Sequence, residues 1–271
     1  MDIYKDKSKR HVLSLSGGKD SSALAVYLQD KIEDIEYVFT DTRKELPETY
    51  EYLDKLEVFL GKEIHRLVYD GGDFDDLVNS RGGFLPSAHI RWCTEQLKIK
   101  PFEKYIGDDH CYTYIGIRAD ETHRIGYISN KSNMTPVYPF IEDGIVKADV
   151  TRILEESGLG FPEYYKWRSR SGCYFCFFQQ KIEWVGLLEN HPDLFEKAKE
   201  YENFHLDHGR RYTWSQSESL EELEKPERIE KIKKDFKIRE EKEREKKNNH
   251  LLVDMFSIEE DDDDSCLICH L

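Results

Sequence analysis

The sequence has no long apolar run. No segment of its 271 residues approaches about 18 consecutive apolar residues, the length that a membrane-spanning helix needs. Its first ten residues, MDIYKDKSKR, are charged and lack the apolar stretch of a signal peptide. We therefore expect a cytoplasmic protein that does not associate with a membrane.

The sequence also has no excess of positive charge. Its formal net charge is −15, with −8 over residues 1–215 and −7 over residues 216–271. This balance argues against strong non-specific binding to a nucleic acid duplex, which depends on neutralising phosphates. A local basic groove remains compatible with it.

Apolar runs of strand length alternate with amphipathic helical patterns over the first 120 residues. We expect strands over 11–16, 36–42, 64–69 and 111–121, the last running into a loop. Helices are expected over 20–30, 47–60 and 94–106, with a kink or break at Pro101. This alternation predicts an α/β fold with a doubly wound parallel sheet, whose ligands bind beyond the carboxyl ends of the strands.

The stretch HVLSLSGGKDSSALAVYL, residues 11–28, carries the clearest functional signal. A buried strand ends in a glycine turn, and a helix starts directly after it. Backbone N–H groups of such a turn and of the helix N-terminus bind anions, and Lys19 adds a point charge. The alternative is a simple capped helix start.

This turn fits neither of the two common nucleotide-binding patterns. A Walker A loop would need glycine where Leu13 stands, and the G-x-G-x-x-G fingerprint is missing. We therefore expect a nucleotide phosphate held by a shorter loop.

The string LSLSGGKDSSAL resembles the PP-loop of the ATP pyrophosphatase superfamily, whose members cleave ATP to AMP and pyrophosphate. FTDTRKELPETYEYL (39–53), RWCTEQLKIKP (91–101), YIGIRADETHR (114–124) and the region 158–176 are similar to its phosphoadenosine phosphosulfate reductase-like branch. The motif order is closest to the ATP pyrophosphatase of DNA phosphorothioation. The resemblance covers about residues 10–180 and implies a Rossmann-like, adenine nucleotide alpha hydrolase-like sheet.

The resemblance implies a site that binds ATP with Mg²⁺. Lys19, Asp41 and Arg118 would take part in catalysis, Lys19 by stabilising charge as the α–β bond of ATP breaks. The nucleotide-binding residues would be Ser14, Ser16, Gly17, Gly18, Lys19, Asp20, Ser21, Ser22, Asp41, Arg118 and Arg124. Two alternatives stay open: Asp41 could cap a turn, and Asp120 and Glu121 could pair with the arginines and orient them.

The six cysteines suggest a metal site, because a cytosolic protein more often uses such a set for metals or catalysis than for disulfides. Cys173 and Cys176 form a C-x-x-C, whose thiolates can reach one metal. The resemblance adds Cys93, and three thiolates would suit a [4Fe–4S] cluster with one open iron; zinc is the alternative. No fourth cysteine occurs in residues 177–200. Cys111, within an expected strand, is expected to be a buried core residue.

The residues after 160 differ in character from those before. We expect an α/β domain over 1–160, a Cys- and aromatic-rich segment with helices over 161–215, and a C-terminal extension over 216–271. That extension would hold a charged helix, 220–247, and a partly disordered acidic tail. Arg168 and Arg170, among aromatic residues, could form a basic lip for nucleic acid or simply pack.

The cysteines near the C-terminus leave three alternatives. Cys266 and Cys269 could complete a Cys₄ zinc site with Cys173 and Cys176, act like the mobile tail of sulfonucleotide reductases, or be dispensable.

The resemblance favours an ATP-dependent, adenylating sulfur-transfer enzyme. It would activate an oxygen of a nucleic acid or a small acceptor, and a partner such as a cysteine desulfurase would supply sulfur. One alternative is a phosphoadenylylsulfate or adenylylsulfate reductase with Cys269 as nucleophile, although such reductases tend to degrade the SGGKDS loop. Another is a non-catalytic nucleotide-binding subunit that recruits a partner through helix 220–247.

Overall fold

The computed structural model describes residues 3–122, 124, 131–203, 212–215 and 218–248. These residues form two compact units. Unit 1 consists of the described residues up to 82 and from 88 to 174, and unit 2 consists of residues 83–87 and the described residues from 175 onward. Over these ranges, no helix has the length and apolar character required to cross a membrane.

Unit 1 is built on a five-stranded sheet in which every neighbouring pair is parallel. The strand order is β3-β2-β1-β4-β5. The strands are β1 (Arg10–Leu15), β2 (Ile35–Thr40), β3 (Ile64–Leu67), β4 (Cys111–Tyr114) and β5 (Met134–Val137). The predicted doubly wound α/β fold is confirmed. The sequence analysis missed β5, whose four residues MTPV include a proline.

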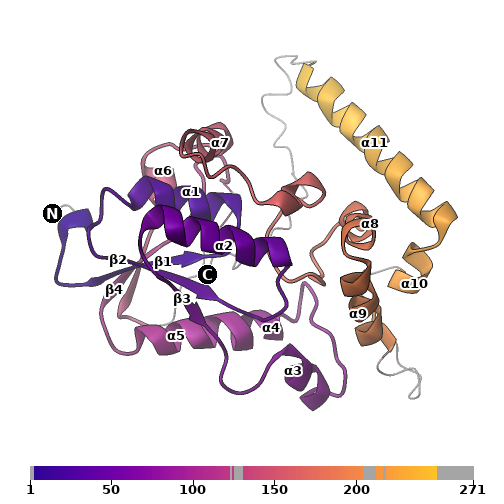
Figure 1. Ribbon diagram of the computed structural model, residues 1–271, viewed down its shortest axis with the longest axis horizontal. Coiled ribbons are helices and arrows are strands. Elements are labelled where there is room, and N and C mark those ends of the chain that lie inside the picture. Colours follow the sequence, from indigo (N-terminus) through magenta and orange to yellow (C-terminus); the bar gives the residue numbers. More distant parts are fainter. Residues whose placement is uncertain (1–2, 123, 125–130, 204–211, 216–217, 249–271) are drawn as a thin grey trace. The chain divides into compact units, whose positions relative to one another are not determined.

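Helices cover both faces of the sheet (Figure 1). Leu13 and Leu15 of β1 belong to a core formed with α1 (Lys19–Leu28), α2 (Pro47–Leu60) and α7 (Lys147–Glu156). Val12, on the opposite face of the same strand, packs with Phe102 and Ile106 of α5 (Lys100–Ile106). Because both faces are covered, β1 is buried almost throughout rather than at alternate residues.

The segment expected as a helix over 94–106 is helical throughout, and its irregular part lies before Pro101 rather than at it. A short helix, α4 (Trp92–Thr94), continues into a π-helical turn, η2 (Glu95–Ile99), and then into α5. Pro101 lies in the first turn of α5, where a missing backbone N–H costs little. The other short elements of unit 1 are η1 (Ile3–Lys5), α3 (Phe74–Ser80), α6 (Pro139–Glu142) and η3 (Glu163–Lys166).

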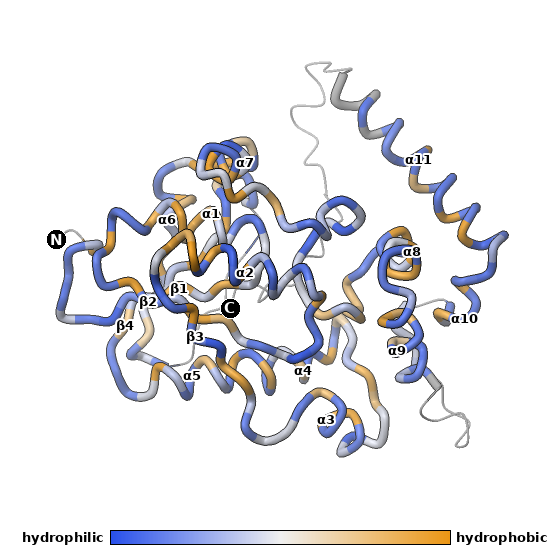
Figure 2. Tube along the Cα trace, in the orientation of Figure 1, coloured by the Kyte–Doolittle hydropathy of each residue, from blue (hydrophilic) through white to orange (hydrophobic). Residues whose placement is uncertain are grey.

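Unit 2 is helical and has an aromatic core. Its helices are α8 (Lys181–Asn190), α9 (Pro192–Asn203), α10 (Leu220–Leu223) and α11 (Pro226–Asn248). The ring of Phe175 stacks on Trp214 at 4.9 Å between centroids. Figure 2 shows α11 as mainly hydrophilic, and the charged helix expected over 220–247 is divided in the structure between α10 and α11. The predicted acidic tail, with Cys266 and Cys269, lies outside the described residues.

Candidate active site

The sheet topology brings two loops together at one point of its carboxyl edge. β1 pairs with β2 on one side and with β4 on the other, so the strand order reverses between β1 and β4. In doubly wound sheets a ligand crevice forms beyond the strand ends at such a reversal. Residues 16–18 follow β1 there, and residues 115–124 follow β4. The two approach closely: a Cβ added at Gly116 would lie 3.2 Å from the carbonyl oxygen of Asp20.

The glycine turn between β1 and α1 is held by serine hydroxyls. The N–H groups of Ser16 and Gly18 donate to Ser21 Oγ (3.2 Å) and Ser16 Oγ (3.3 Å), and Ser21 Oγ donates to the Gly18 carbonyl (3.2 Å). Gly17 has φ +69°, and an added Cβ would lie 2.6 Å from Thr49 Cγ2. The turn is therefore preformed, and Gly17 is required for both its conformation and its packing.

Helix α1 begins at Lys19, and Tyr165 contacts both the backbone N–H and the side chain of this residue. The Lys19 N–H, which has no acceptor within its own helix, donates to the Tyr165 hydroxyl at 3.1 Å. The Lys19 ammonium lies 5.2 Å from the centroid of the same tyrosine ring. Burial raises the pKa of the Tyr165 phenol above its ordinary value, although the Lys19 N–H opposes this shift. The hydroxyl is therefore uncharged at neutral pH.

Two more residues from the same segment contact the glycine turn. Tyr164, in η3, donates from its hydroxyl to the carbonyl oxygen of Gly17 at 2.7 Å. Ser171 donates to Ser16 Oγ at 3.2 Å. The sequence analysis did not assign Tyr164, Tyr165 or Ser171 to the site. The available signal was the aromatic pair in FPEYYKW, which it interpreted as packing or as a lip for nucleic acid.

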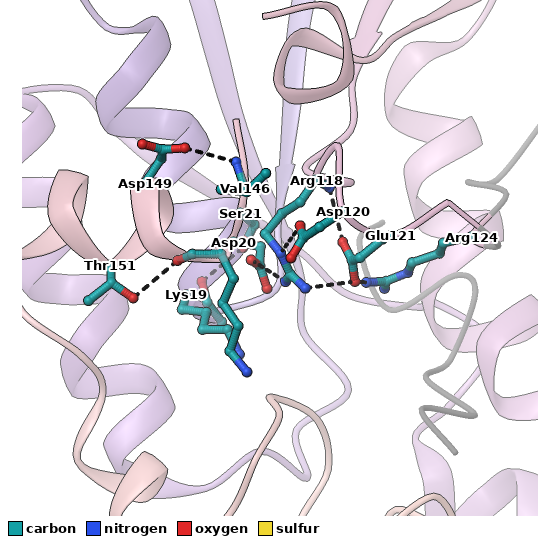
Figure 3. Close-up of polar contacts among 12 residues, drawn as sticks. Lys19, Asp20, Ser21, Arg118, Asp120, Glu121, Arg124, Val146, Asp149 and Thr151 are labelled. Carbon is teal, nitrogen blue, oxygen red and sulfur yellow. Dashed lines mark hydrogen bonds and ion pairs between the residues drawn. The ribbon is translucent and has the colours of Figure 1, made fainter. Parts of the chain in front are cut away.

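Arg118 lies at the centre of a buried ion-pair network (Figure 3). Its guanidinium contacts Asp20 Oδ1 through Nη1 (2.9 Å), Asp120 Oδ1 through Nε (2.9 Å) and Glu121 Oε1 through Nη2 (3.6 Å). Arg124 Nη1 donates to the same Glu121 oxygen at 2.7 Å. Burial alone would lower the pKa of Arg118, but the three carboxylates, Asp20 first, raise it above its ordinary value. Arg118 is therefore a fixed cation.

This network favours the alternative in which Asp120 and Glu121 orient the arginines. It also places Asp20 of the SGGKDS string beside Arg118, linking the start of α1 to the loop after β4. A nucleotide contact by Asp20, Arg118 or Arg124 stays a prediction.

Asp41 follows β2 directly, at the strand end where the sequence placed it. Its Oδ1 atom accepts hydrogen bonds from the Arg43 N–H (2.7 Å) and the Tyr50 hydroxyl (2.8 Å). Both donors meet one oxygen, so the other carboxylate oxygen can meet a metal ion or a nucleotide. Ser14 Oγ, in β1, is buried and has no hydrogen-bond partner within the described residues. A buried unpaired hydroxyl is costly, so Ser14 fits the expectation that a ligand completes this region. Ser22 is buried in α1.

The structure does not support the predicted metal set Cys93, Cys173 and Cys176. Within the described ranges, no group of three or more Cys, His, Asp or Glu side chains could hold a metal ion. Instead, Cys173 Sγ lies 3.2 Å from Thr42 Oγ1 and 3.7 Å from Glu45 Oε1. The structure therefore gives no support for an iron–sulfur cluster.

Two further predictions, for Arg168 and Cys111, have clear outcomes. Arg168 is 2% exposed and donates to the carbonyls of Gly172 and Cys173 at 3.0 Å each. It therefore packs, and its part in a basic lip for nucleic acid was wrong. Cys111 is a fully buried core residue of β4, as predicted.

Comparison with known proteins agrees with this geometry. Residues 10–139, which run from β1 to the end of the sheet, match the family model of the phosphoadenosine phosphosulfate reductase domain. Two uncharacterised proteins of Methanocaldococcus jannaschii are 28% and 29% identical over 208 and 209 residues. Each alignment covers 72% of this chain, but only 48% and 42% of those proteins, so the chain spans less than half of their length. A nin region protein of Escherichia phage lambda is 32% identical over 148 residues, 42% of this chain and 50% of its own.

Solved structures resemble the chain at low identity. A phosphoadenylyl-sulfate reductase from Candida auris has 16% identity and a TM-score of 0.49, covering 62% of this chain and 82% of its own. An NH3-dependent NAD synthetase from Campylobacter jejuni has 14% identity and a TM-score of 0.43, covering 78% of this chain and 91% of its own. The residues that match the family model include the five strands of the sheet, the SGGKDS turn and the arginine loop, and this part of the chain is therefore similar to the phosphoadenosine phosphosulfate reductase domain.

Proposed function

We propose that this chain binds ATP at the N-terminus of α1 and transfers AMP to an oxygen atom of an acceptor, as the activating half of a sulfur-transfer reaction. One observation carries the proposal: the preformed turn Ser16–Gly18 and the amide and ammonium of Lys19 lie at the topological switch point, beside the loop of Arg118. A helix N-terminus with a lysine beside it is suited to phosphate groups.

The reaction has two balanced steps. An acceptor oxygen forms a bond to the α-phosphorus of ATP, the bond from that phosphorus to the bridging oxygen breaks, and its electron pair leaves with pyrophosphate. Hydrosulfide, supplied by a partner, then forms a bond to the activated atom of the acceptor, the bond from that atom to the adenylated oxygen breaks, and AMP leaves with this oxygen and its electron pair while the proton of hydrosulfide passes to solvent. Lys19 would stabilise the charge on the leaving pyrophosphate, and the turn would fix the phosphates in line.

Mg²⁺ fits this site through Asp41. Its carboxylate has both protein donors on one oxygen, and Mg²⁺ is commonly bound by one or two carboxylates together with substrate phosphates. When bound, the ion would neutralise phosphate charge as the α–β bond breaks. Asp41 itself would hold the ion at the strand end, while Tyr50 and Arg43 fix the carboxylate.

The predicted cluster of cysteines takes no part in this proposal, because the described residues contain no group of three or more Cys, His, Asp or Glu side chains that could hold a metal ion. The acceptor and the sulfur donor are proposed by chemical class only. A nucleic acid base or phosphate, or a small carbonyl compound, offers an oxygen of the required kind.

The test is cleavage at the α–β bond. Purified protein with Mg²⁺, sodium sulfide and bulk tRNA or DNA is incubated with β,γ-methylene-ATP, which can be cleaved to AMP but resists loss of its γ-phosphate. We expect AMP release that falls at least 100-fold in Lys19→Ala, since one preorganised charge is worth about 10²–10³ in rate. Lys104→Ala is the matched control, because Lys104 is an exposed surface lysine paired with Asp70. Equal AMP release by wild type and Lys19→Ala would refute the proposal.

A further inference from the structure

The position that a phosphate would occupy at Lys19 already holds an internal ligand. The backbone N–H of Lys19 donates to the Tyr165 hydroxyl, and the Lys19 ammonium faces the ring of the same tyrosine. These two groups are the ones that the proposed function assigns to phosphate. A phenol supplies an acceptor oxygen for the amide and a negative ring face for the ammonium.

We propose that Tyr165 is a displaceable gate, which occupies the phosphate position at the start of α1 and must leave it when a nucleotide binds. The inference rests on the proposed function, because it takes the Lys19 amide and ammonium as phosphate ligands. It adds that binding is a competition between a phosphate group and the phenol. A single N–H points at one acceptor with good geometry, so Tyr165 and a phosphate oxygen exclude each other there.

The rest of the segment around Tyr165 is anchored to unit 1 on both sides. Before it, the carbonyls of Leu159 and Gly160 accept hydrogen bonds from Lys55 (2.6 Å) and Tyr52 (3.0 Å) of α2. After it, Ser171 is bound to Ser16. Since these anchors do not involve the Lys19 amide, the exchange requires only a local movement of η3 or rotation of one side chain.

Tyr164 provides an internal contrast. Its ring packs 4.8 Å from that of Tyr165, but its hydroxyl donates to the carbonyl oxygen of Gly17. A carbonyl is not a phosphate ligand, so this bond supports the turn without blocking it. The adjacent tyrosines therefore have opposite roles, one holding the turn in place and the other covering its donor.

The gate makes a prediction of unusual sign: removing a hydrogen bond from the site should tighten ligand binding. In Tyr165→Phe the ring is kept and only the competing oxygen is lost. A net hydrogen bond of ordinary strength then corresponds to roughly two- to tenfold tighter binding of inorganic pyrophosphate and of β,γ-methylene-ATP. Tyr164→Phe should not tighten binding of either ligand.

Isothermal titration calorimetry on the full chain measures both affinities in wild type, Tyr165→Phe, Tyr164→Phe and Lys19→Ala. A second readout follows the gate itself: 3-fluorotyrosine placed at position 165 should change its ¹⁹F resonance on pyrophosphate addition, with the midpoint found by calorimetry. Weaker or unchanged binding by Tyr165→Phe would overturn the gate proposal, and so would a ¹⁹F resonance that does not change when pyrophosphate is added. If the gate proposal fails in this way but Lys19→Ala loses binding, the proposed function still stands. If neither wild type nor Tyr165→Phe binds pyrophosphate or nucleotide, both proposals fail.

Discussion

The contact between Arg118 and Asp20 provides the strongest quantitative test of the site. The two side chains are each 10% exposed, and their charged atoms lie 2.9 Å apart. For charge centres roughly 4 Å apart and an effective dielectric constant near 20, one such attraction is worth about 4 kcal/mol before desolvation is subtracted. Removing one partner of a buried pair costs more than the pair contributes, because the remaining charge is left buried and unpaired.

Arg118→Met keeps the length of the side chain and removes its charge. It leaves Asp20, Asp120 and Glu121 around the turn without their shared cation, although Arg124 still contacts Glu121. We expect the free energy of unfolding to fall by about 3–5 kcal/mol. Asp20→Asn should cost less, about 1–3 kcal/mol, because Arg118 keeps two carboxylates and the amide oxygen can still accept a hydrogen bond.

Urea unfolding followed by circular dichroism measures these changes. The double variant should be less destabilised than the sum of the two single variants, because it removes the unpaired charge along with its partner. Arg66→Met is the control, since Arg66 pairs with the exposed Asp54 at the surface and should cost less than about 1 kcal/mol. A loss below about 1 kcal/mol in Arg118→Met would refute the interpretation of Arg118 as the residue that holds the two loops together.

Two other predictions concern separate parts of the chain. Gly17→Ala should destabilise the fold by more than about 1 kcal/mol, because alanine is strained at φ +69° and its Cβ would clash with Thr49 Cγ2. Adding Thr49→Ser removes that methyl group and should recover part of the lost stability in the same urea assay. No recovery would contradict the packing argument. In unit 2, hydrogen bonds from Arg228, opposed by burial and supported by Lys181, lower the pKa of Glu218 to about 2. The stability from this carboxylate is complete above the ordinary pKa near 4.5 and is lost as the pH falls toward 2. The melting temperature of Glu218→Gln should therefore be lower than that of the wild type at pH 7 and converge with it near pH 2. An equal difference in melting temperature at both pH values would contradict the assignment.

Much of the fold could be predicted from local patterns. The strand and helix of residues 11–28 and the helix of residues 47–60 have clear periodicity and clear ends, and the structure places α2 over Pro47–Leu60, as predicted. β5 could not be recognised, because it has four residues, one of them proline, and its identity as a strand depends on pairing with β4. Short strands of this kind are defined by tertiary contacts rather than by their own sequence.

The site was predicted where its residues share one motif and missed where they come from distant segments. The turn from Ser16 to Lys19 was found because glycine, lysine and serine occur together before a helix. Tyr165 lies 146 residues further along the chain, and only the fold brings it to Lys19. For the cysteines, spacing shows which thiols can share a metal but not which other side chains lie beside them, as Glu45 lies beside Cys173.

The ion pairs also change how the site can attract a phosphate. The sequence suggested that Arg118 and Arg124 clamp the ligand, yet both guanidiniums contact carboxylates of the same loop and of α1. Two arginines facing Asp20, Asp120 and Glu121 leave this cluster with a formal charge of −1. Attraction must then come from Lys19, from the backbone N–H groups of the turn and from a metal ion that arrives with the ligand. For this reason we expect nucleotide binding to depend strongly on Mg²⁺, and the arginine network to act by fixing the shape of the turn rather than by holding phosphate.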